Sequence, residues 1–173
     1  MKIALVDIET TGLLPTEHEI IEIGMVVFDS NTMRIIEEWS TKVKPVYPEN
    51  GSPKAYAVNG YNDEDWAEAP DIIPVLETFV EKTKDCVFVA YNVAFDWGFL
   101  EFQMTKYGIE HHMSYQKMCL MSMAFAKVPH DKVFSWSLKT VATYLGVPRE
   151  SATHRAMGGV KCEYGVYCKL MSL

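Results

Sequence analysis

Three apolar segments separated by short turn-forming stretches make up the first quarter of the chain. Residues 2–7 (KIALVD) form an apolar run that ends in an acid, and residues 20–30 (IIEIGMVVFDS) are rich in β-branched side chains. Residues 34–45 (RIIEEWSTKVKP) follow closely and stop at Pro45. Because the connections are too short for helical crossovers, the pattern predicts three adjacent strands in an antiparallel meander.

A loop and then helices are predicted for the next part of the chain. Residues 45–60 carry three prolines, two glycines and few periodic apolar positions, which predicts a loop with at most one helical turn. A short helix capped by Asn62 or Asp63 follows, and residues 71–85 then show helical spacing behind the candidate cap Asp71. The predicted apolar stripe of this helix consists of Ile72, Ile73, Leu76, Phe79 and Val80.

Strand and helix patterns alternate in the second half of the chain. Residues 86–92 (CVFVAYN) form a continuous apolar run that is typical of a buried parallel strand. Residues 94–108 repeat apolar side chains at helical spacing and end at Gly108, which predicts a helix with a glycine stop. A short strand at 115–119 is expected to run directly into another helix.

Two further helices complete the predicted order. Residues 135–146 are amphipathic, with Ser135 or Ser137 as the cap and Gly146 as the stop. Residues 154–173 also have helical spacing, although each internal glycine lowers helix propensity by about 1 kcal/mol relative to alanine. This order of elements predicts an α/β fold, with helices packed around a mixed sheet.

Size, composition and charge fit one ordinary globular domain. The 173 residues suffice for one sizeable core, since domains commonly span roughly 100–200 residues. We therefore expect a single domain over residues 1–173. The composition, 49% apolar and 23% charged residues, is that of a folded globular protein and excludes a disordered chain. The formal charge of −7 argues against a broad grip on duplex nucleic acid, but it allows a small site in which divalent cations supply positive charge.

The N-terminal segment and the cysteines indicate where the protein works. MKIALVDIETTG has one lysine and a short apolar run, which predicts a core strand and not a signal peptide. No stretch approaches the ~20 apolar residues of a membrane span, so no membrane contact is expected. The four cysteines do not form the close C-x-x-C pairs of zinc or redox motifs, and reduced thiols fit an intracellular, cytoplasmic protein.

Three acidic residues follow buried-strand patterns. Asp7 and Glu9 lie two positions apart, so both side chains point to the same face of a strand. Such a pair is usually just solvated, but at the end of a central strand like charges are costly to bury unless a cation pairs with them. Asp96 lies near a helix start, where it could simply favour the helix dipole. Together they offer oxygen ligands for two Mg²⁺ or Mn²⁺ ions, which can assist phosphodiester cleavage.

Three segments resemble, in order and across nearly the whole chain, the motifs of the DnaQ-like, DEDDh 3′–5′ exonuclease family. They are DIETTG at 7–12, AYNVAFDWGFL at 90–100, and SLKTVATYLGV at 137–147 followed by ATHRAMGG at 152–159. AVNGY at 57–61 is similar to the family's additional substrate-side turn. The resemblance implies a ribonuclease H-like fold, a mixed five-stranded sheet flanked by helices, which agrees with the predicted element order.

The resemblance also implies roles for single residues. Asp7, Glu9 and Asp96 would be ligands of two Mg²⁺ or Mn²⁺ ions, with Asp7 between them. His154 would be the general base that takes a proton from the attacking water, a role suited to imidazole because its pKa lies near neutrality. The residues expected to meet the terminal nucleotide are Thr10, Thr11, Gly12, Leu13, Asn92 and Phe95. Turn chemistry and core packing are the alternatives for these six, and for Phe95 core packing is an equal alternative.

The third motif departs from the family pattern at Gly159. The family has an aspartate five residues after the histidine, and glycine offers no side chain to a metal. On a helix that includes both positions, His154 and residue 159 would both face the ions. Glu163 is the nearest acid, one turn further along roughly the same face, and its longer side chain could reach part of the way. Deliberate alteration and a naturally weakened site both explain the glycine.

Two functions follow from the resemblance. The first is a metal-dependent 3′–5′ exonuclease that removes nucleoside 5′-monophosphates from single-stranded DNA or RNA ends, impaired by Gly159. The acidic charge favours short or frayed substrates, or a partner such as a DNA polymerase or replication protein that presents the strand. The second is a non-catalytic nucleic-acid or polymerase-partner binding domain that retains the exonuclease fold. A wholly different metal hydrolase fits poorly, because His154 and the TTG turn both match the exonuclease pattern.

Overall fold

The computed structural model describes residues 1–149 and 152–173, which form a mixed five-stranded sheet in the order β3-β2-β1-β4-β5. β1 pairs antiparallel with β2 and β2 with β3, whereas β4 runs parallel to both β1 and β5. The predicted meander and the predicted mixed sheet are therefore confirmed. The strands are Lys2–Thr10 (β1), Ile20–Asp29 (β2), Ile35–Lys42 (β3), Val87–Ala90 (β4) and Lys117–Cys119 (β5).

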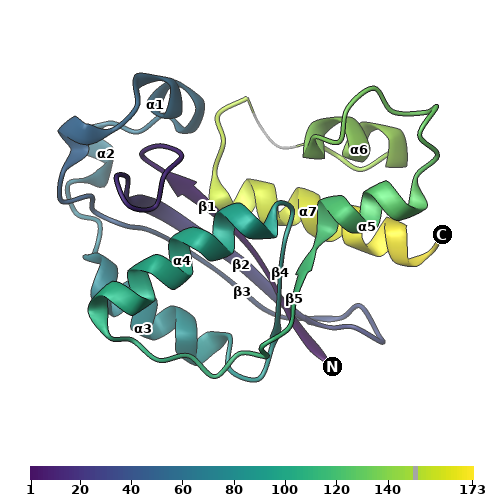
Figure 1. Ribbon diagram of the computed structural model, residues 1–173, viewed down its shortest axis with the longest axis horizontal. Coiled ribbons are helices and arrows are strands. Elements are labelled where there is room, and N and C mark those ends of the chain that lie inside the picture. Colours follow the sequence, from purple (N-terminus) through teal and green to yellow (C-terminus); the bar gives the residue numbers. More distant parts are fainter. Residues whose placement is uncertain (150–151) are drawn as a thin grey trace.

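Helices cover both faces of the sheet, with α3 and α4 on one side and α5, α6 and α7 on the other (Figure 1). In the part of the chain that the structure describes, no helix combines the length and apolar character needed to cross a membrane. The helices are Pro53–Asn59 (α1), Asp63–Trp66 (α2), Ile72–Lys82 (α3), Val93–Tyr107 (α4), Leu120–Lys127 (α5), Leu138–Leu145 (α6) and Ala156–Met171 (α7), with a 3₁₀ turn at Pro48–Asn50.

β1 is buried on both faces because its alternate side chains enter two separate cores. Ile3 and Leu5 pack in the core formed with α5, α6 and α7, whereas Val6 and Ile8 pack in the core formed with α3 and α4. The alternation continues to the end of the strand. The side chain of Asp7 therefore lies on the face covered by α7.

The segment before α2 contains more helix than the sequence predicted. Residues 45–60 were expected to form a loop with at most one helical turn, but α1 has seven residues. Pro53 occupies the first turn of α1, where its fixed φ suits a helix and its missing N–H costs no hydrogen bond. Gly60 ends the helix with a φ of 66°, the left-handed conformation that glycine adopts readily. The prolines and glycines counted as loop formers are thus the start and stop of a helix.

The other predicted helices are present, with one error in a buried stripe. Ile73 is 43% exposed, whereas Val75 is buried beside Leu76 and Phe79. Val75 precedes Phe79 by four residues and lies on its face, while Ile73 projects to solvent from the first turn of α3. At α6, the side chain of Ser137 accepts a hydrogen bond from the backbone of Thr140 at 3.3 Å, as expected of a cap.

The last helix begins two residues later than predicted. α7 starts at Ala156, and Arg155 before it has an extended backbone with φ −142° and ψ 132°. Glu22 of β2 accepts a hydrogen bond from the backbone of Ala156, so a side chain from the sheet caps the helix. His154 consequently lies on a loop, and the expectation that it shares a helical face with position 159 is wrong.

Candidate active site

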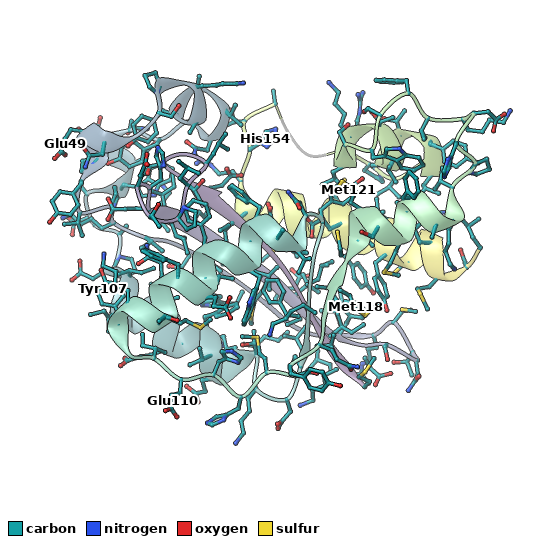
Figure 2. All side chains as sticks on the ribbon, in the orientation of Figure 1. Glu49, Tyr107, Glu110, Met118, Met121 and His154 are labelled. Atoms are coloured by element: carbon teal, nitrogen blue, oxygen red, sulfur yellow. The ribbon has the colours of Figure 1, made fainter. Side chains whose placement is uncertain are left out.

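A cavity of about 940 Å³ opens where the C-terminal ends of β1 and β4 meet α4, α7 and the loop before α7. Asp7 and Glu9 of β1 line it, together with Asp96 from the first turn of α4. His154 lines it from the loop that leads into α7 (Figure 2), and Glu163 lines it from α7 itself. The residues to which the resemblance assigned catalysis therefore meet at one place.

β1 presents Asp7 and Glu9 to the face of the sheet on which α7 packs. In the pairing with β2, Asp7 lies opposite Gly24 and Glu9 lies opposite Glu22. A Cβ on Gly24 would lie 2.6 Å from the backbone carbon of Ala156, so this glycine lets the start of α7 sit directly on the sheet. Asp7 is half-buried and Glu9 is only 9% exposed.

Glu22 is a second buried glutamate beside Glu9, and it has its own partners. Besides the backbone bond from Ala156, the guanidinium of Arg155 lies 3.8 Å from its Oε2 atom. Burial raises the pKa of Glu22, and the charge of Arg155 opposes that rise. Because like charges directly opposed on neighbouring strands repel, these contacts reduce the negative charge that faces Glu9.

Asp96 is the most deeply buried of the three predicted ligands that line the cavity. It is 4% exposed, and one carboxylate oxygen accepts a hydrogen bond from the backbone N–H of Ile8 at 3.3 Å. Burial raises the pKa of Asp96 to about 7, and the bond from Ile8 partly offsets this effect. The bond also ties the start of α4 to the end of β1, which fixes the spacing between Asp96 and the acids on that strand.

Gly159 lies directly against Asp7. A Cβ built on Gly159 would be 2.1 Å from the Oδ2 atom of Asp7, which is closer than real Cβ atoms approach any atom. The absence of a side chain at position 159 is therefore what allows the Asp7 carboxylate to lie against α7. A larger residue there would require Asp7 to move.

Glu163 lies one helical turn beyond Gly159 and is 2% exposed. It lines the same cavity as Asp7, Glu9 and Asp96. Its charge is also felt at Tyr91, whose pKa is raised by burial first and by the Glu163 carboxylate second. The acid that the sequence identified as the nearest to Gly159 is thus buried at the site and does not lie on the outer face of α7.

His154 is exposed and is held by its backbone. Its N–H donates to the carbonyl of Val58 near the end of α1 at 3.1 Å. The next residue, Arg155, donates from Nη1 to the carbonyl of Asn59 at 2.8 Å, and its guanidinium lies 4.9 Å from the centre of the Trp66 ring. The loop is therefore anchored at His154 and at Arg155, and the His154 side chain is exposed.

Residues 57–61, predicted to be a substrate-side turn, form the end of α1 and its glycine stop. Asn59 is 2% exposed, and its Nδ2 atom donates to the carbonyl of Thr10 at 3.0 Å. Because the carbonyls of Val58 and Asn59 also hold the histidine loop, this segment joins the end of β1 to His154. No sequence signal beyond the AVNGY match indicated this joining role.

The TTG turn after β1 is built by its own side chains. The hydroxyl of Thr10 donates to the carbonyl of Gly12 at 2.6 Å, and the hydroxyl of Thr11 accepts from a backbone N–H of the same loop at 2.9 Å. A Cβ on Gly12 would lie 2.0 Å from Cδ2 of His18, so the His18 ring packs against Gly12 and would have to move for any larger residue. Leu13 is 76% exposed at the tip and is available to an apolar surface such as a base.

Two of the residues expected to meet the nucleotide, Asn92 and Phe95, line the cavity close to Asp96. Phe95 is half-buried and packs against Phe99 with the rings tilted by 53° and their centres 5.0 Å apart, so it contributes both to packing and to the cavity wall. Sequence reasoning missed Lys139 and Arg149, which also line the cavity. Single basic residues near a helix start and in a loop are ordinary surface features, so nothing in the sequence distinguished them.

The side chains at this cavity suit a hard divalent cation. Mg²⁺ and Mn²⁺ prefer carboxylate oxygens, and buried carboxylates are costly to ionise unless positive charge is near. The pKa of Asp96 is raised because burial makes its ionised form less favourable. Within the described residues, no three acidic, histidine or cysteine side chains are arranged to hold one ion together, so binding would require rotamer changes at Asp7, Glu9 or Asp96.

Comparison with known proteins connects this geometry to an exonuclease family. The chain matches the model of that family, RNase_T (Exonuclease), over residues 5–164. A DNA polymerase III of PolC type from Thermotoga maritima is 31% identical over 170 residues, which are 98% of this chain and 12% of the polymerase. The 3′-5′ exonuclease DinG of Staphylococcus epidermidis is 30% identical over 155 residues, which are 88% of this chain and 16% of DinG. The chain thus spans less than a fifth of these curated relatives.

The fold is shared with solved exonucleases. E. coli exonuclease I, in complex with a dT13 oligonucleotide, superposes with a TM-score of 0.80 at 17% sequence identity, over 99% of this chain and 41% of that chain. At this identity the likeness shows the fold alone, and it confirms the predicted ribonuclease H-like arrangement. With the family match covering most of its length, the chain belongs to the RNase_T exonuclease family, a DnaQ-like group of the ribonuclease H-like superfamily.

Proposed function

We propose that residues 1–173 act as a single metal-dependent 3′–5′ exonuclease domain that removes nucleoside 5′-monophosphates from single-stranded DNA or RNA ends. The observation that carries this proposal is the convergence of Asp7, Glu9, Asp96 and His154 on one cavity in a member of an exonuclease family. Substrate enters from the side of the TTG turn and the histidine loop, where Leu13 and His154 are exposed.

Asp7, Glu9 and Asp96 would hold two Mg²⁺ or Mn²⁺ ions. When bound, the ions supply the positive charge that stabilises the attacking and leaving oxygens of the phosphodiester. The protein fixes the relative positions of the three carboxylates, because Asp7 and Glu9 lie on one strand and the backbone N–H of Ile8 donates a hydrogen bond to Asp96. The cation would also offset the burial that raises the pKa of Asp96.

His154 takes the proton from the attacking water. The water oxygen forms the new bond to phosphorus, and the bond to the 3′ oxygen of the preceding nucleotide breaks. That oxygen gains a proton from solvent to become the new 3′-hydroxyl, and the nucleoside 5′-monophosphate is released. Because His154 is exposed, it can return the proton to solvent before the next cycle. The backbone bond to Val58 sets the position of the loop that carries the imidazole.

The terminal nucleotide binds between the TTG turn and α4. Thr10, Thr11 and Gly12 form the turn, and Leu13 offers an exposed apolar side chain to the base. Asn92 and Phe95, at the start of α4, form the opposite wall of the cavity. Lys139 and Arg149 offer positive charge to the phosphates of the strand in an otherwise acidic protein.

The strand is presented by a DNA polymerase or another replication protein, or it is a short or frayed end. The net charge of −7 gives weak attraction for long nucleic acids, and the Thermotoga maritima relative is a polymerase. The proposal includes a cytoplasmic location, since none of the four cysteines, all within the described residues, takes part in a disulfide.

A second candidate is a non-catalytic domain that binds nucleic acid or a polymerase partner and retains the fold. Gly159 favours it, because the position that holds an aspartate in the family pattern offers no ligand here. In that case the cavity binds a nucleotide without turning it over.

Release of mononucleotides from a 3′-labelled single-stranded oligonucleotide, DNA and RNA in parallel, tests the proposal. We expect Mg²⁺- or Mn²⁺-dependent release of labelled monophosphate, loss of release with a chelator, and loss in Asp96→Asn. A 5′-labelled strand should give a descending ladder, which establishes the direction. Oligonucleotide binding without release from either substrate in either metal would instead establish the non-catalytic candidate.

A further inference from the structure

We infer that Glu163 supplies the carboxylate ligand that position 159 lacks, so that the fourth acidic ligand of this site is moved one helical turn along α7. This inference rests on the proposed function, since it concerns the same ions. Gly159 makes room for the Asp7 carboxylate beside α7, and Glu163 supplies the carboxylate that contacts the ion.

The space beside Gly159 is already taken by Asp7. A Cβ at position 159 would lie 2.1 Å from Asp7 Oδ2, so with Asp7 in this place no side chain can be attached there. At residue 159 the helix face that meets the acids of β1 therefore carries no side chain, and Asp7 lies against the helix backbone there. The next position on the same face is four residues away, which is about 6 Å along the helix axis at 1.5 Å per residue.

Glu163 is the residue at that next position, and it is directed into the site. It is 2% exposed, and it lines the cavity with Asp7, Glu9 and Asp96. Glutamate is one methylene longer than aspartate, which partly makes up for the extra turn. Because Gly159 has no side chain, Asp7 lies against α7 one turn before Glu163, and both carboxylates line the same cavity.

The acids that surround Glu163 suit a bound cation. An ionised carboxylate is costly to bury, and the cost increases when other carboxylates share the same cavity. A residue that only filled space here would be expected to be neutral or apolar, like Val160 and Val166 on the same helix. A cation among Asp7, Asp96 and Glu163 reverses the sign of these interactions.

The first experiment measures Mn²⁺ binding by calorimetry, without nucleic acid, for the full chain and for Glu163→Gln. We expect the substitution to weaken Mn²⁺ binding by at least about tenfold, the lower end of the effect seen when groups around a metal are removed. Glu38→Gln is the matched control, because Glu38 contacts the outer side of α7 through Lys161 at 3.1 Å and lies outside the cavity. Equal Mn²⁺ affinity in Glu163→Gln and the unaltered chain overturns the inference.

The second measurement separates a ligand from a structural residue. In a chelator, Glu163→Gln should melt at the same temperature as the unaltered chain or higher, because one of several like charges is removed. With Mn²⁺ present, the variant should gain less in melting temperature than the unaltered chain. A lower melting temperature in chelator with an unchanged gain from Mn²⁺ would identify a structural residue and overturn the inference.

A further variant keeps the test decisive if Glu163→Gln folds poorly. Glu163→Asp retains the charge but shortens the reach, and it should also weaken Mn²⁺ binding. Undiminished Mn²⁺ affinity in Glu163→Asp overturns the inference.

The outcomes distinguish this inference from the proposed function. Strong Mn²⁺ binding and cleavage that persist in every Glu163 variant overturn the inference and leave the exonuclease function intact. Binding that depends on Glu163, without cleavage of DNA or RNA, supports the inference and overturns the exonuclease function. A chain that binds no Mn²⁺ overturns both.

Discussion

The side-chain amide of Asn59 donates a hydrogen bond to the backbone carbonyl of Thr10 at 3.0 Å, which joins the end of α1 to the end of β1. The carbonyl of Asn59 accepts a bond from Arg155 at 2.8 Å, immediately after His154. Asn59 therefore fixes the strand that carries the acids relative to the loop that carries the proposed base.

Asn59→Ala should lower both stability and turnover. The substitution leaves the buried carbonyl of Thr10 and the N–H of Tyr61 without their side-chain partner, which should cost about 1–3 kcal/mol of unfolding free energy. Displacement of the histidine loop should lower kcat by roughly tenfold to a hundredfold. Urea denaturation and single-strand cleavage measure the two effects.

Asn62→Ala is the control for that prediction. Asn62 caps α2 by accepting from the backbone of Asp65 at 2.9 Å, so its loss should cost about 1 kcal/mol. Because its hydrogen bonds go to Gly60 and Asp65, next to α2, kcat should stay unchanged. Equal kcat values for the two variants would show that Asn59 does not position the site.

Gly159→Ala should separate helix stability from site chemistry. Alanine improves helix propensity by up to about 1 kcal/mol, but its Cβ would meet Asp7 at 2.1 Å and force that carboxylate away from α7. We expect cleavage and Mn²⁺ affinity to fall by at least about tenfold, with little loss of unfolding free energy.

Gly98→Ala provides the matched substitution within α4. A Cβ on Gly98 meets nothing within 4 Å, so this variant should gain helix propensity and keep full activity. If Gly159→Ala cleaves as fast as Gly98→Ala, the close approach of Gly159 to Asp7 has no bearing on the reaction.

The stability of the metal-free protein should depend on Asp96. Burial raises the pKa of Asp96 to about 7 in the folded chain, above the ordinary value of 3.8. The folded state therefore holds this proton over a pH range in which the unfolded chain has lost it. The contribution of Asp96 to stability is fully present below about pH 4 and is lost as pH rises toward 7.

Asp96→Asn removes this dependence. In a chelator, urea denaturation at pH 5 and pH 8 should show a smaller loss of unfolding free energy for Asp96→Asn than for the unaltered chain. Divalent cations should oppose the loss in the unaltered chain only, because they favour the ionised carboxylate. Parallel pH profiles for the two proteins would contradict a raised pKa at Asp96.

Much of this fold could be predicted because most of its elements carry a clear local pattern. The continuous apolar run of β1 and the apolar spacing in α4 and α6 appear directly in the sequence. α1 was missed because proline and glycine disrupt the interior of a helix but are favoured at its ends, where Pro53 and Gly60 lie. The start of α7 was misplaced because a contact from Glu22, distant in sequence, determines it.

The site was predictable to the same degree. Asp7, Glu9, Asp96 and His154 could be selected from motifs, and the structure places them at one cavity. The burial of Glu163 and the contact between Gly159 and Asp7 depend on how α7 packs on the sheet, which no local pattern in the sequence encodes.

Lys139 should contribute to binding of the strand and not to the chemical step. Its exposed ammonium group lines the cavity and is available to a phosphate, so Lys139→Ala should raise KM and leave kcat nearly unchanged. Loss of one phosphate contact should also reduce the magnitude of the slope of log Kd against log salt by about 0.7 for a single strand. Fluorescence anisotropy of a labelled oligonucleotide in a chelator measures that slope without cleavage.

Lys106→Ala is the charge-matched control for this prediction. Lys106 lies at the C-terminal end of α4, with its Nζ 5.1 Å from the centre of the Tyr107 ring, whereas the cavity lies at the N-terminal end of that helix. Both variants change the net charge equally, so a general field effect would alter their salt slopes equally. A reduced slope in Lys139→Ala alone would assign the contact to the cavity, and equal slopes would show that Lys139 acts only through the overall charge.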